Sequence, residues 1–174
     1  MRPDPDPFLE ALQPHYDDAL RYVRGLCAKL SVRDAEDAVQ AGLLRAFEAF
    51  GSLRDPARFR PWLFQILTRE VYGARRRAFW RRFVPLVETP AALALFTDSV
   101  DATDLLAALA RLGDREREAL LLYEVGGFRV DEIRALQGDR SASAVKSRLA
   151  RARSRLRDLL DEAPAPPVPS TRAA

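Results

Sequence analysis

Apolar residues recur at helical spacing along most of the chain, and no stretch alternates with the two-residue period of a strand. Proline and glycine interrupt the pattern, and Ser31 with Asp34 three residues later forms a capping signature. We therefore expect an all-α fold. The predicted helices cover residues 8–30 with a break near Pro14, 35–50, 59–83, 104–112, 115–125, a short segment from Val130 to Leu136, and 143–160.

Residues 84–103 divide these helices into two groups. They contain Pro85, Pro90 and scattered apolar residues without a clear period, which is typical of a linker. The prediction is two small helical domains, residues 8–83 and 104–161, joined by a flexible linker at 84–103. Residues 1–7 are expected to be a flexible lead, and the proline-rich tail at 162–174 to be disordered.

The last predicted helix is apolar on one side and basic on the rest. Its apolar stripe is interleaved with lysine and arginine, and no acid occurs until Asp158. A helix of this kind suits the DNA major groove, whose walls are phosphates. The alternative is a solvated basic face on an ordinary bundle helix. The stripe consists of Val145, Leu149, Ala152, Leu156 and Leu159.

The residues before this helix favour DNA binding. A short amphipathic helix ends near Gly138, and Ser141 or Ser143 can cap the helix that follows. Two helices joined by such a turn, the second one basic, have the spacing of a helix-turn-helix. Arg140 and Arg151 would then hold phosphates. The residues expected to face bases are Ser143, Ala144, Lys146, Ser147 and Arg148.

The helix over 59–83 interleaves arginines with aromatic residues. Arginine neutralises phosphate, and an aromatic ring can stack on an unpaired base, a contact that contributes roughly 1–3 kcal/mol. The alternative is that the rings pack inside the protein, and we expect Trp62 and Ile66 to be core residues. The residues of interest are Phe59, Arg60, Trp62, Arg69, Arg75, Arg76, Arg77 and Trp80.

Composition narrows the class of protein. The net charge is only +3, but the basic residues are segregated, with five arginines between Arg75 and Arg82.

Cys27 and His15 are each the sole residue of their type, so we expect no disulfide, no metal site and no cofactor. The start of the chain does not read as a signal peptide, and no apolar run approaches a membrane span, so we expect a cytoplasmic protein with no direct membrane insertion. No nucleophile–base pair or phosphate loop stands out, and we expect no enzyme activity.

Three motifs in order resemble the extracytoplasmic-function, or group IV, sigma factors of the sigma-70 family. The segment DAEDAVQ at 34–40, followed by LLRAF at 43–47, is similar to the DAED-x-x-Q helix of region 2 in that family. FRPWL at 59–63, followed by Ile66, is similar to its F-x-x-W-L-x-x-I motif. The segment that ends in VKSR at 145–148 and RAR at 151–153 resembles region 4. The resemblance covers residues 8–160.

The resemblance implies a promoter-specificity subunit of RNA polymerase. Its region 2 would bind the β′ clamp helices through Asp37, Gln40, Leu44, Arg45 and Phe47. The loop at 51–58, including Arg54, and the start of the next helix would capture a flipped base of the −10 element. The C-terminal helix-turn-helix, with Ser141 included, would read the −35 element. The further partners implied are the β flap of the polymerase and an anti-sigma factor, possibly membrane-bound.

The chain departs from the family pattern at several positions. Arg69 and Gly73 stand where Asn and Asp are common, which puts contacts to the melted strand in doubt. Leu112-Gly113 replaces a frequent Leu-Pro, Arg134 a usual Ala, and Ala144 a usual Thr. The turn of the helix-turn-helix also reads as one residue longer than usual. The −35 preference therefore cannot be copied from relatives.

Two other hypotheses explain part of the pattern. A stand-alone helix-turn-helix regulator would use only the C-terminal domain, and it leaves the motif at 34–40 unexplained. A helical adaptor for acidic proteins would use the basic faces without any preference for DNA. The order of the three motifs favours the sigma factor over both hypotheses.

Overall fold

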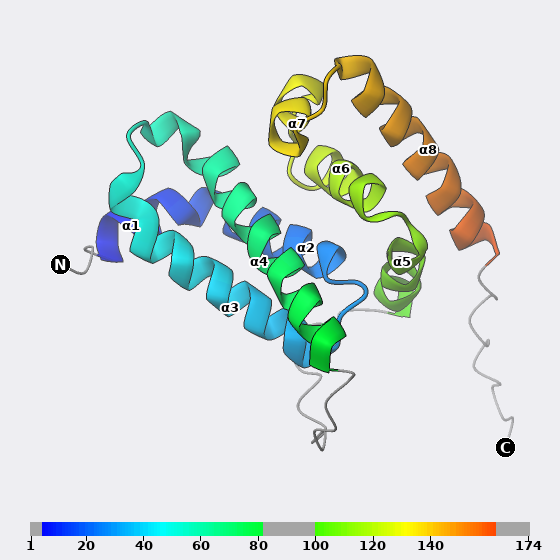
Figure 1. Ribbon diagram of the computed structural model, residues 1–174, viewed down its shortest axis with the longest axis horizontal. Helices are drawn as coiled ribbons and strands as arrows, with labels where there is room; N and C mark the ends of the chain where they lie inside the picture. The colour runs from blue at the N-terminus through cyan, green and yellow to red at the C-terminus, as the bar shows by residue number, and fades with distance from the viewer. Residues whose placement is uncertain (1–4, 82–99, 163–174) are drawn as a thin grey trace, which may run out of the picture.

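The computed structural model describes residues 5–81 and 100–162, and every regular element in these ranges is helical (Figure 1). The helices form two groups, which we call the N-terminal and the C-terminal bundle. The N-terminal bundle consists of α1 (Pro5–Leu12), α2 (Tyr16–Leu26), α3 (Val32–Ala49) and α4 (Phe59–Arg81), with short 3-10 turns at Gln13–His15, Phe50–Ser52 and Pro56–Arg58. The C-terminal bundle consists of α5 (Val100–Arg111), α6 (Asp114–Glu124), α7 (Val130–Gln137) and α8 (Ala142–Asp161).

Local signals in the sequence start and stop these helices as predicted. Pro14 lies in the 3-10 turn between α1 and α2. The hydroxyl of Ser31 caps α3 by accepting a hydrogen bond from the backbone N–H of Asp34 at 3.2 Å. Ser141, rather than Ser143, caps α8 in the same way through the N–H of Ala144. Gly138 ends α7 with φ of 66°, a conformation that glycine adopts without strain.

Several predicted boundaries were wrong by three or four residues, since α2 ends at Leu26 rather than residue 30 and α3 begins at Val32 rather than residue 35. Helix α1 begins at Pro5, inside the lead that was expected to be flexible, because proline fits the first helical turn, where its missing N–H costs nothing. Helix α5 begins at Val100 rather than Asp104, so neither Asp101 nor Thr103 caps it from outside. The rest of the linker and the tail beyond Glu162 lie outside the described residues.

Helices α3 and α4 lie side by side and make the body of the N-terminal bundle (Figure 1). They approach closely at Gly42, where an added Cβ would meet the Leu67 side chain at 2.7 Å. At one end, an aromatic cluster ties α1 to α3 and α4. Phe8 is its centre, with ring centroids 5.5–6.0 Å from those of Phe47, Phe50 and Phe59. Edge-to-face rings at this spacing fix the relative orientation of the three helices.

The C-terminal bundle buries the predicted apolar stripe of α8. Val145, Leu149, Ala152 and Leu159 are buried, and Leu156 packs against them half-buried. Ile133 of α7 is fully buried in the same core. The two helices and their turn thus form the helix-turn-helix that the spacing predicted.

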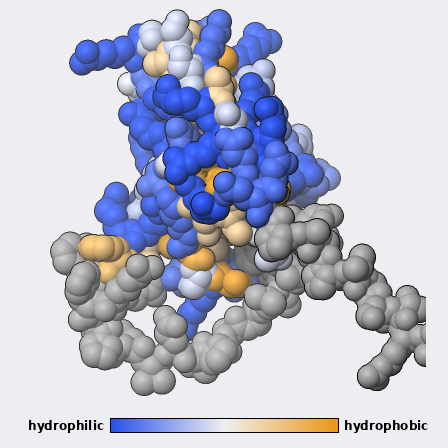
Figure 2. Space-filling model, turned by 90° about the vertical axis from the view of Figure 1, so that its right-hand side faces the viewer, coloured by the Kyte–Doolittle hydropathy of each residue, from blue (hydrophilic) through white to orange (hydrophobic). Residues whose placement is uncertain are grey.

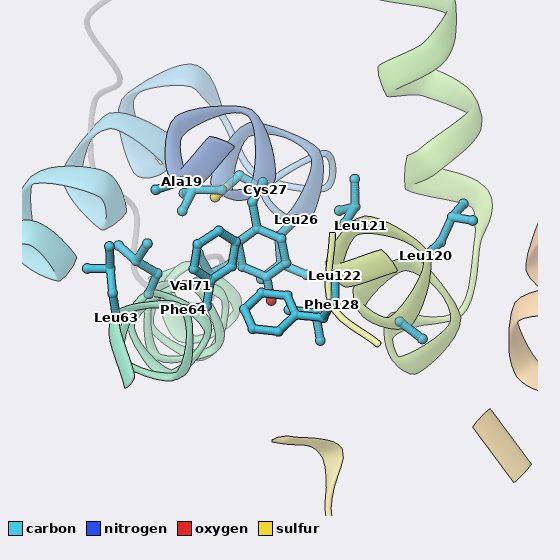
Figure 3. Packing of buried hydrophobic residues seen from close by; sticks show 14 of the residues in the cluster. Ala19, Leu26, Cys27, Leu63, Phe64, Val71, Leu120, Leu121, Leu122 and Phe128 are labelled. Atoms are coloured by element: carbon cyan, nitrogen blue, oxygen red, sulfur yellow. The ribbon is translucent and has the colours of Figure 1, made fainter. Parts of the chain in front are cut away.

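The two bundles pack against each other, and their buried residues form one continuous core. Figure 3 shows Phe64 of α4 and Phe128, which precedes α7, close together between the bundles, and their rings pack edge to face. The ring centroids are 5.1 Å apart. At Gly25, α2 approaches α6 so closely that an added Cβ would lie 2.7 Å from the Leu121 side chain. The sequence pattern, which predicted two domains and a linker, did not predict this contact.

Candidate nucleic-acid interface

The outward face of α8 offers a row of small and basic side chains to solvent. Ser143, Lys146, Ser147 and Arg151 are exposed, and Arg140 is exposed just before the helix. Ala144 is half-buried, and the Ser141 hydroxyl is engaged as the helix cap. The surface on this side of the molecule is largely hydrophilic (Figure 2). The N-terminal half of α8 therefore has the exposure and charge that a groove-reading helix needs.

Arg148 lies in a different environment from its neighbours on α8. It is only 12% exposed, and its guanidinium donates to the Gln137 side chain at 2.6 Å and to the Asp139 carboxylate at 2.9 Å. The hydrogen bond from Arg148 lowers the pKa of Asp139. This pair joins the two helices across their turn, so in this conformation Arg148 braces the helix-turn-helix rather than projecting outward.

The start of α4 combines a buried ring with a half-buried one. Phe59 is only 4% exposed and belongs to the aromatic cluster around Phe8. Its ring supports Trp62, whose centroid lies 5.7 Å away and whose side chain is half-buried. Of the two residues expected in the core, Ile66 is buried and Trp62 is not fully so. Trp62 therefore retains a surface that could meet a base, whereas Phe59 contributes packing.

The arginines of α4 and of the preceding loop divide into two sets. Arg54, Arg69, Arg76 and Arg77 are exposed. Arg60 and Arg75 instead reach the C-terminal bundle. The guanidinium of Arg60 lies 4.4 Å from the centre of the Phe128 ring, and Arg75 donates to the Asp114 carboxylate at 2.7 Å. Trp80 lies in the last turn of α4, and its side chain is outside the described residues.

A charged cluster occupies the contact between the bundles. Lys29 and Arg75 from the N-terminal bundle both contact the Asp114 carboxylate. Arg117, which is 0% exposed, donates to the same carboxylate at 3.0 Å from within α6. Although partial burial opposes it, the hydrogen bond and charge of Arg75, with those of Lys29, lower the pKa of Asp114 to about 2. Asp114 therefore stays ionised at neutral pH and holds cations from both bundles.

A second polar contact lies beside this cluster. The Tyr72 hydroxyl of α4 donates to the Glu118 carboxylate of α6 at 2.6 Å. Burial raises the pKa of both groups, that of Tyr72 beyond its usual range and that of Glu118 above its ordinary value. Removing a buried carboxylate from its hydrogen-bond donor is costly, so this bond helps to fix the position of α6 on α4.

The outer face of α3 carries the residues predicted to bind polymerase. Asp37, Gln40 and Leu44 follow each other along one side of the helix, and Leu44 is 57% exposed. Arg45 is also exposed and pairs with Glu70 of α4 at 2.9 Å. Phe47 is half-buried against Phe8. Leu44 is thus an exposed apolar side chain among polar ones, at the position where the resemblance places the polymerase contact.

Within residues 5–81 and 100–162, no group of three His, Cys, Asp or Glu side chains is placed to hold a metal ion. Cys27 is buried, and burial raises the pKa of its thiol to about 12. None of the described helices is both long and apolar enough to cross a membrane.

Two regions of the sigma-70 family match the chain in the order that the motifs suggested. Residues 12–81 match Sigma-70 region 2, and residues 102–156 match Sigma-70 region 4. The ECF RNA polymerase sigma factor EcfG of Rhodopseudomonas palustris is 31% identical over 88% of this chain and 87% of EcfG. The chain belongs to the extracytoplasmic-function sigma factors of the sigma-70 family. Sigma factors of this family are non-enzymatic transcription initiation factors.

Other relatives agree with this assignment. RNA polymerase sigma factor CarQ of Myxococcus xanthus is 33% identical over 80% of this chain and 83% of CarQ. The structure of the sigma factor RpoE bound to the anti-sigma factor NepR of Bartonella quintana has a TM-score of 0.72 and 29% identity, over 89% of this chain and 97% of RpoE. The structure of CnrH with the cytosolic domain of CnrY has a TM-score of 0.66 and 26% identity, over 91% of this chain and 90% of CnrH.

Several residues of this sigma factor that shape the site were missed from the sequence. The sequence pattern predicts a helix at Arg117 and Glu118 and no burial of their side chains, yet both are buried. Their place in the run REREALLL, where the helix period turns them inward, is the signal that could have found them. Gly25 inside a helix was a second signal, because a mid-helix glycine often marks close packing.

Proposed function

We propose that this chain acts as an alternative sigma factor in which the N-terminal bundle carries the region 2 activities and the C-terminal bundle carries the region 4 activities. Residues 8–83 and 104–161 are the corresponding functional units. The observation that carries the proposal is a helix-turn-helix with an exposed basic face in the same chain as a region 2 bundle whose α3 face is exposed. Each surface suits one of the two partners that initiation brings together, promoter DNA and core polymerase.

The α8 face would read the −35 element. Lys146, with Ser143 and Ser147 beside it, lies where the N-terminal end of a recognition helix meets base edges. Arg140 and Arg151 flank this row and would contact phosphates, which position the helix without reading sequence. Arg148 would act mainly by holding the two helices of the motif at a fixed angle through Asp139.

The α4 surface would meet the opened −10 element. Trp62 offers a partly exposed ring for a base, and Arg54, Arg69, Arg76 and Arg77 offer charge for the backbone nearby. Arg60 and Arg75 are instead engaged with Phe128 and Asp114 of the C-terminal bundle. Binding energy gained from an unpaired base offsets part of the cost of opening the duplex, which is how a protein without catalytic groups can favour strand separation.

The α3 face would bind core polymerase. Leu44 supplies an apolar anchor, and Asp37, Gln40 and Arg45 supply the polar rim that such interfaces usually have. We place this activity in the cytoplasm, where a bacterial polymerase and promoter meet. An anti-sigma factor is a further expected partner, because two of the structural relatives are described in complex with one or with a partner's cytosolic domain.

The test of this proposal is run-off transcription with sigma-free core polymerase on a promoter library that includes the region upstream of the chain's own gene. We expect a discrete transcript that requires the protein. A protein that neither binds core polymerase nor yields a transcript would contradict the proposal. Sequence-specific binding of the free protein to duplex DNA, without polymerase, would instead support the stand-alone regulator.

A further inference from the structure

A cavity opens on one side of the contact between the two bundles, where α4, α6 and α7 meet. Its volume is about 480 Å³, which lies within the range of about 300–1,000 Å³ that is usual for small-molecule sites. Such sites occur preferentially where two domains meet. The cavity includes no residue of the α8 face or of the α3 face described above.

The side chains that a ligand could reach in this cavity are mostly polar. Phe64 forms part of the wall, but it is 0% exposed and offers almost no surface. Gln65, Arg69 and Arg115 line the cavity and are exposed, and Leu136 is half-buried. A ligand that fits this cavity should therefore be small and rich in hydrogen-bonding groups, with one apolar edge for Leu136.

Two arginines from different bundles line the cavity with unused donors. The Arg69 guanidinium of α4 has no hydrogen-bond or ion-pair partner within residues 5–81 and 100–162. Arg115 of α6 donates to the Gln137 carbonyl oxygen and to the Asp139 carboxylate, and both of these bonds use its Nη2 atom. A planar guanidinium fits a carboxylate or a phosphate. Both arginines can therefore bind an oxyanion.

Two carboxylates in the wall, those of Asp114 and Glu118, are already engaged. Three cations contact Asp114, and the Tyr72 hydroxyl donates to Glu118 at 2.6 Å. Glu118 is also only 7% exposed, so it offers little surface to a cationic ligand. Together with the two arginines of the wall, the cations at Asp114 outnumber the acids, and their field favours an anion. These three cations are Lys29, Arg75 and Arg117.

We propose that this cavity is a binding site for a small organic anion. Arg69 and Arg115 bind its carboxylate or phosphate group. Gln65 forms hydrogen bonds with its polar body, and Leu136 contacts its apolar edge. The inference goes beyond the proposed promoter function and does not require it, because the ligand binds the free protein.

Isothermal titration calorimetry of the full-length free protein tests the site with three probes. Adenosine 5′-monophosphate carries a phosphate on a planar polar body, 4-hydroxybenzoate carries a carboxylate on a smaller ring, and inorganic phosphate supplies the charge alone. At least one organic probe should bind one-to-one with a Kd below about 1 mM, and at least about tenfold more tightly than inorganic phosphate. The organic probe that binds more tightly distinguishes a phosphate ester from a carboxylate.

Failure of both organic probes to saturate the protein would overturn the site. Inorganic phosphate that bound as tightly as either organic probe would overturn it as well, because the cavity would then contact the charge and not the body of the ligand.

Three variants of the cavity wall test where the probe binds. Arg69→Gln and Arg115→Gln should each weaken binding at least about tenfold, because charge-assisted hydrogen bonds are the stronger ones. Gln65→Trp fills the cavity from an exposed position and should abolish binding. Arg77→Gln is the matched control, since it makes the same change of charge at an exposed position of α4 outside the cavity. It should change the affinity by less than about twofold, because solvent and salt screen a separate surface charge.

Thermal unfolding followed by circular dichroism is the folding control and the second readout. Gln65, Arg69 and Arg77 are exposed, so their variants should unfold like the wild type when no probe is present. A ligand that binds only the folded protein raises the unfolding midpoint. The tighter organic probe should therefore raise the midpoint of the wild type and of Arg77→Gln, but not that of Gln65→Trp.

Equal affinity in all variants would overturn the site, as would a loss in Arg77→Gln as large as that in Arg69→Gln. Either result would mean that the basic surface attracts anions without a defined cavity. Neither measurement uses polymerase or a promoter, so this test can fail while the transcription test succeeds, or the reverse.

Discussion

Helices α4 and α8 are both rich in arginine, yet they place it in different surroundings. On α8, Arg151 and Arg153 are exposed and pair with Glu116 and Glu124 of their own bundle. On α4, Arg76 and Arg77 are exposed, while Arg75 crosses to the other bundle. The ion pairs of Arg151 and Arg153 on α8 therefore do not depend on how the bundles are arranged, whereas that of Arg75 on α4 does.

The comparison shows that a basic stretch of sequence does not by itself place its charges on the protein surface. A basic run on a helix with one buried stripe predicts its own exposed face, because the stripe fixes the orientation of the helix. A basic run on a helix that is packed on several sides does not. For α4, the neighbours decide which arginines remain free to meet DNA.

The largest effect on stability should come from the face of α4 that contacts the C-terminal bundle. Phe64 is fully buried and contacts both Tyr22 and Phe128. Phe64→Ala should lower the free energy of unfolding by about 3–5 kcal/mol, because the cavity spans both bundles. Gln65→Ala, at the neighbouring exposed position, should change it by less than about 0.5 kcal/mol. Urea denaturation measures the free energy of unfolding of both variants. Equal losses of stability would contradict an interface that uses only one face of α4.

A smaller effect is expected at the brace of the helix-turn-helix. Arg148→Ala leaves the Asp139 carboxylate, which is only 9% exposed, without its main partner. The free energy of unfolding should fall by about 2 kcal/mol, as for other buried hydrogen bonds to charged groups. Arg155→Ala, exposed on the same helix, is the control and should be nearly neutral. If both variants were equally stable, Arg148 would be free to read bases instead.

The α3 face tests whether polymerase binding is separate from both arginine-rich helices. Leu44→Arg should weaken binding to sigma-free core polymerase by at least about tenfold, because it places a charge at the proposed apolar anchor. Arg21→Ala on α2 is a control that removes a local ion pair away from this face. Fluorescence anisotropy of the labelled protein, titrated with core polymerase, gives both affinities. Unchanged binding by Leu44→Arg would move the polymerase site elsewhere.

The smallest effect should be that of a single phosphate contact. Arg151→Ala should reduce the slope of log affinity against log salt by about 0.9 for duplex DNA and weaken all sequences alike. Binding isotherms at several salt concentrations, on duplexes with and without the −35 element, provide the measurement. A loss confined to one sequence would mean that Arg151 reads a base.

The helix-turn-helix was predictable because its signals are local. The stripe of α8, the cap at Ser141 and the glycine at Gly138 each act within a few residues, and the sequence shows them directly. The core role of Phe59 and the bracing role of Arg148 were not predictable in the same way. Each depends on partners brought by other elements, Phe8 in one case and Asp139 in the other.

The docking of the bundles depended on still more distant partners. Phe64 and Phe128 belong to different bundles, and no periodicity relates them. Only the inward register of Arg117 and the glycine at Gly25 hinted that these helix faces had a neighbour. A sequence pattern identifies a buried face, but it does not say which distant face covers it.

The most direct test of separate roles for α4 and α8 compares Trp62→Ala with Lys146→Ala in promoter opening by the reconstituted polymerase. Permanganate reactivity of unpaired thymines reports opening, and a gel shift reports total promoter binding. Trp62→Ala should leave polymerase bound while the −10 thymines stay unreactive. Lys146→Ala should weaken binding in a way that depends on one −35 base pair, by about 1–3 kcal/mol. If both variants lost binding and opening in parallel, on every promoter, the assignment of separate tasks to α4 and α8 would be contradicted.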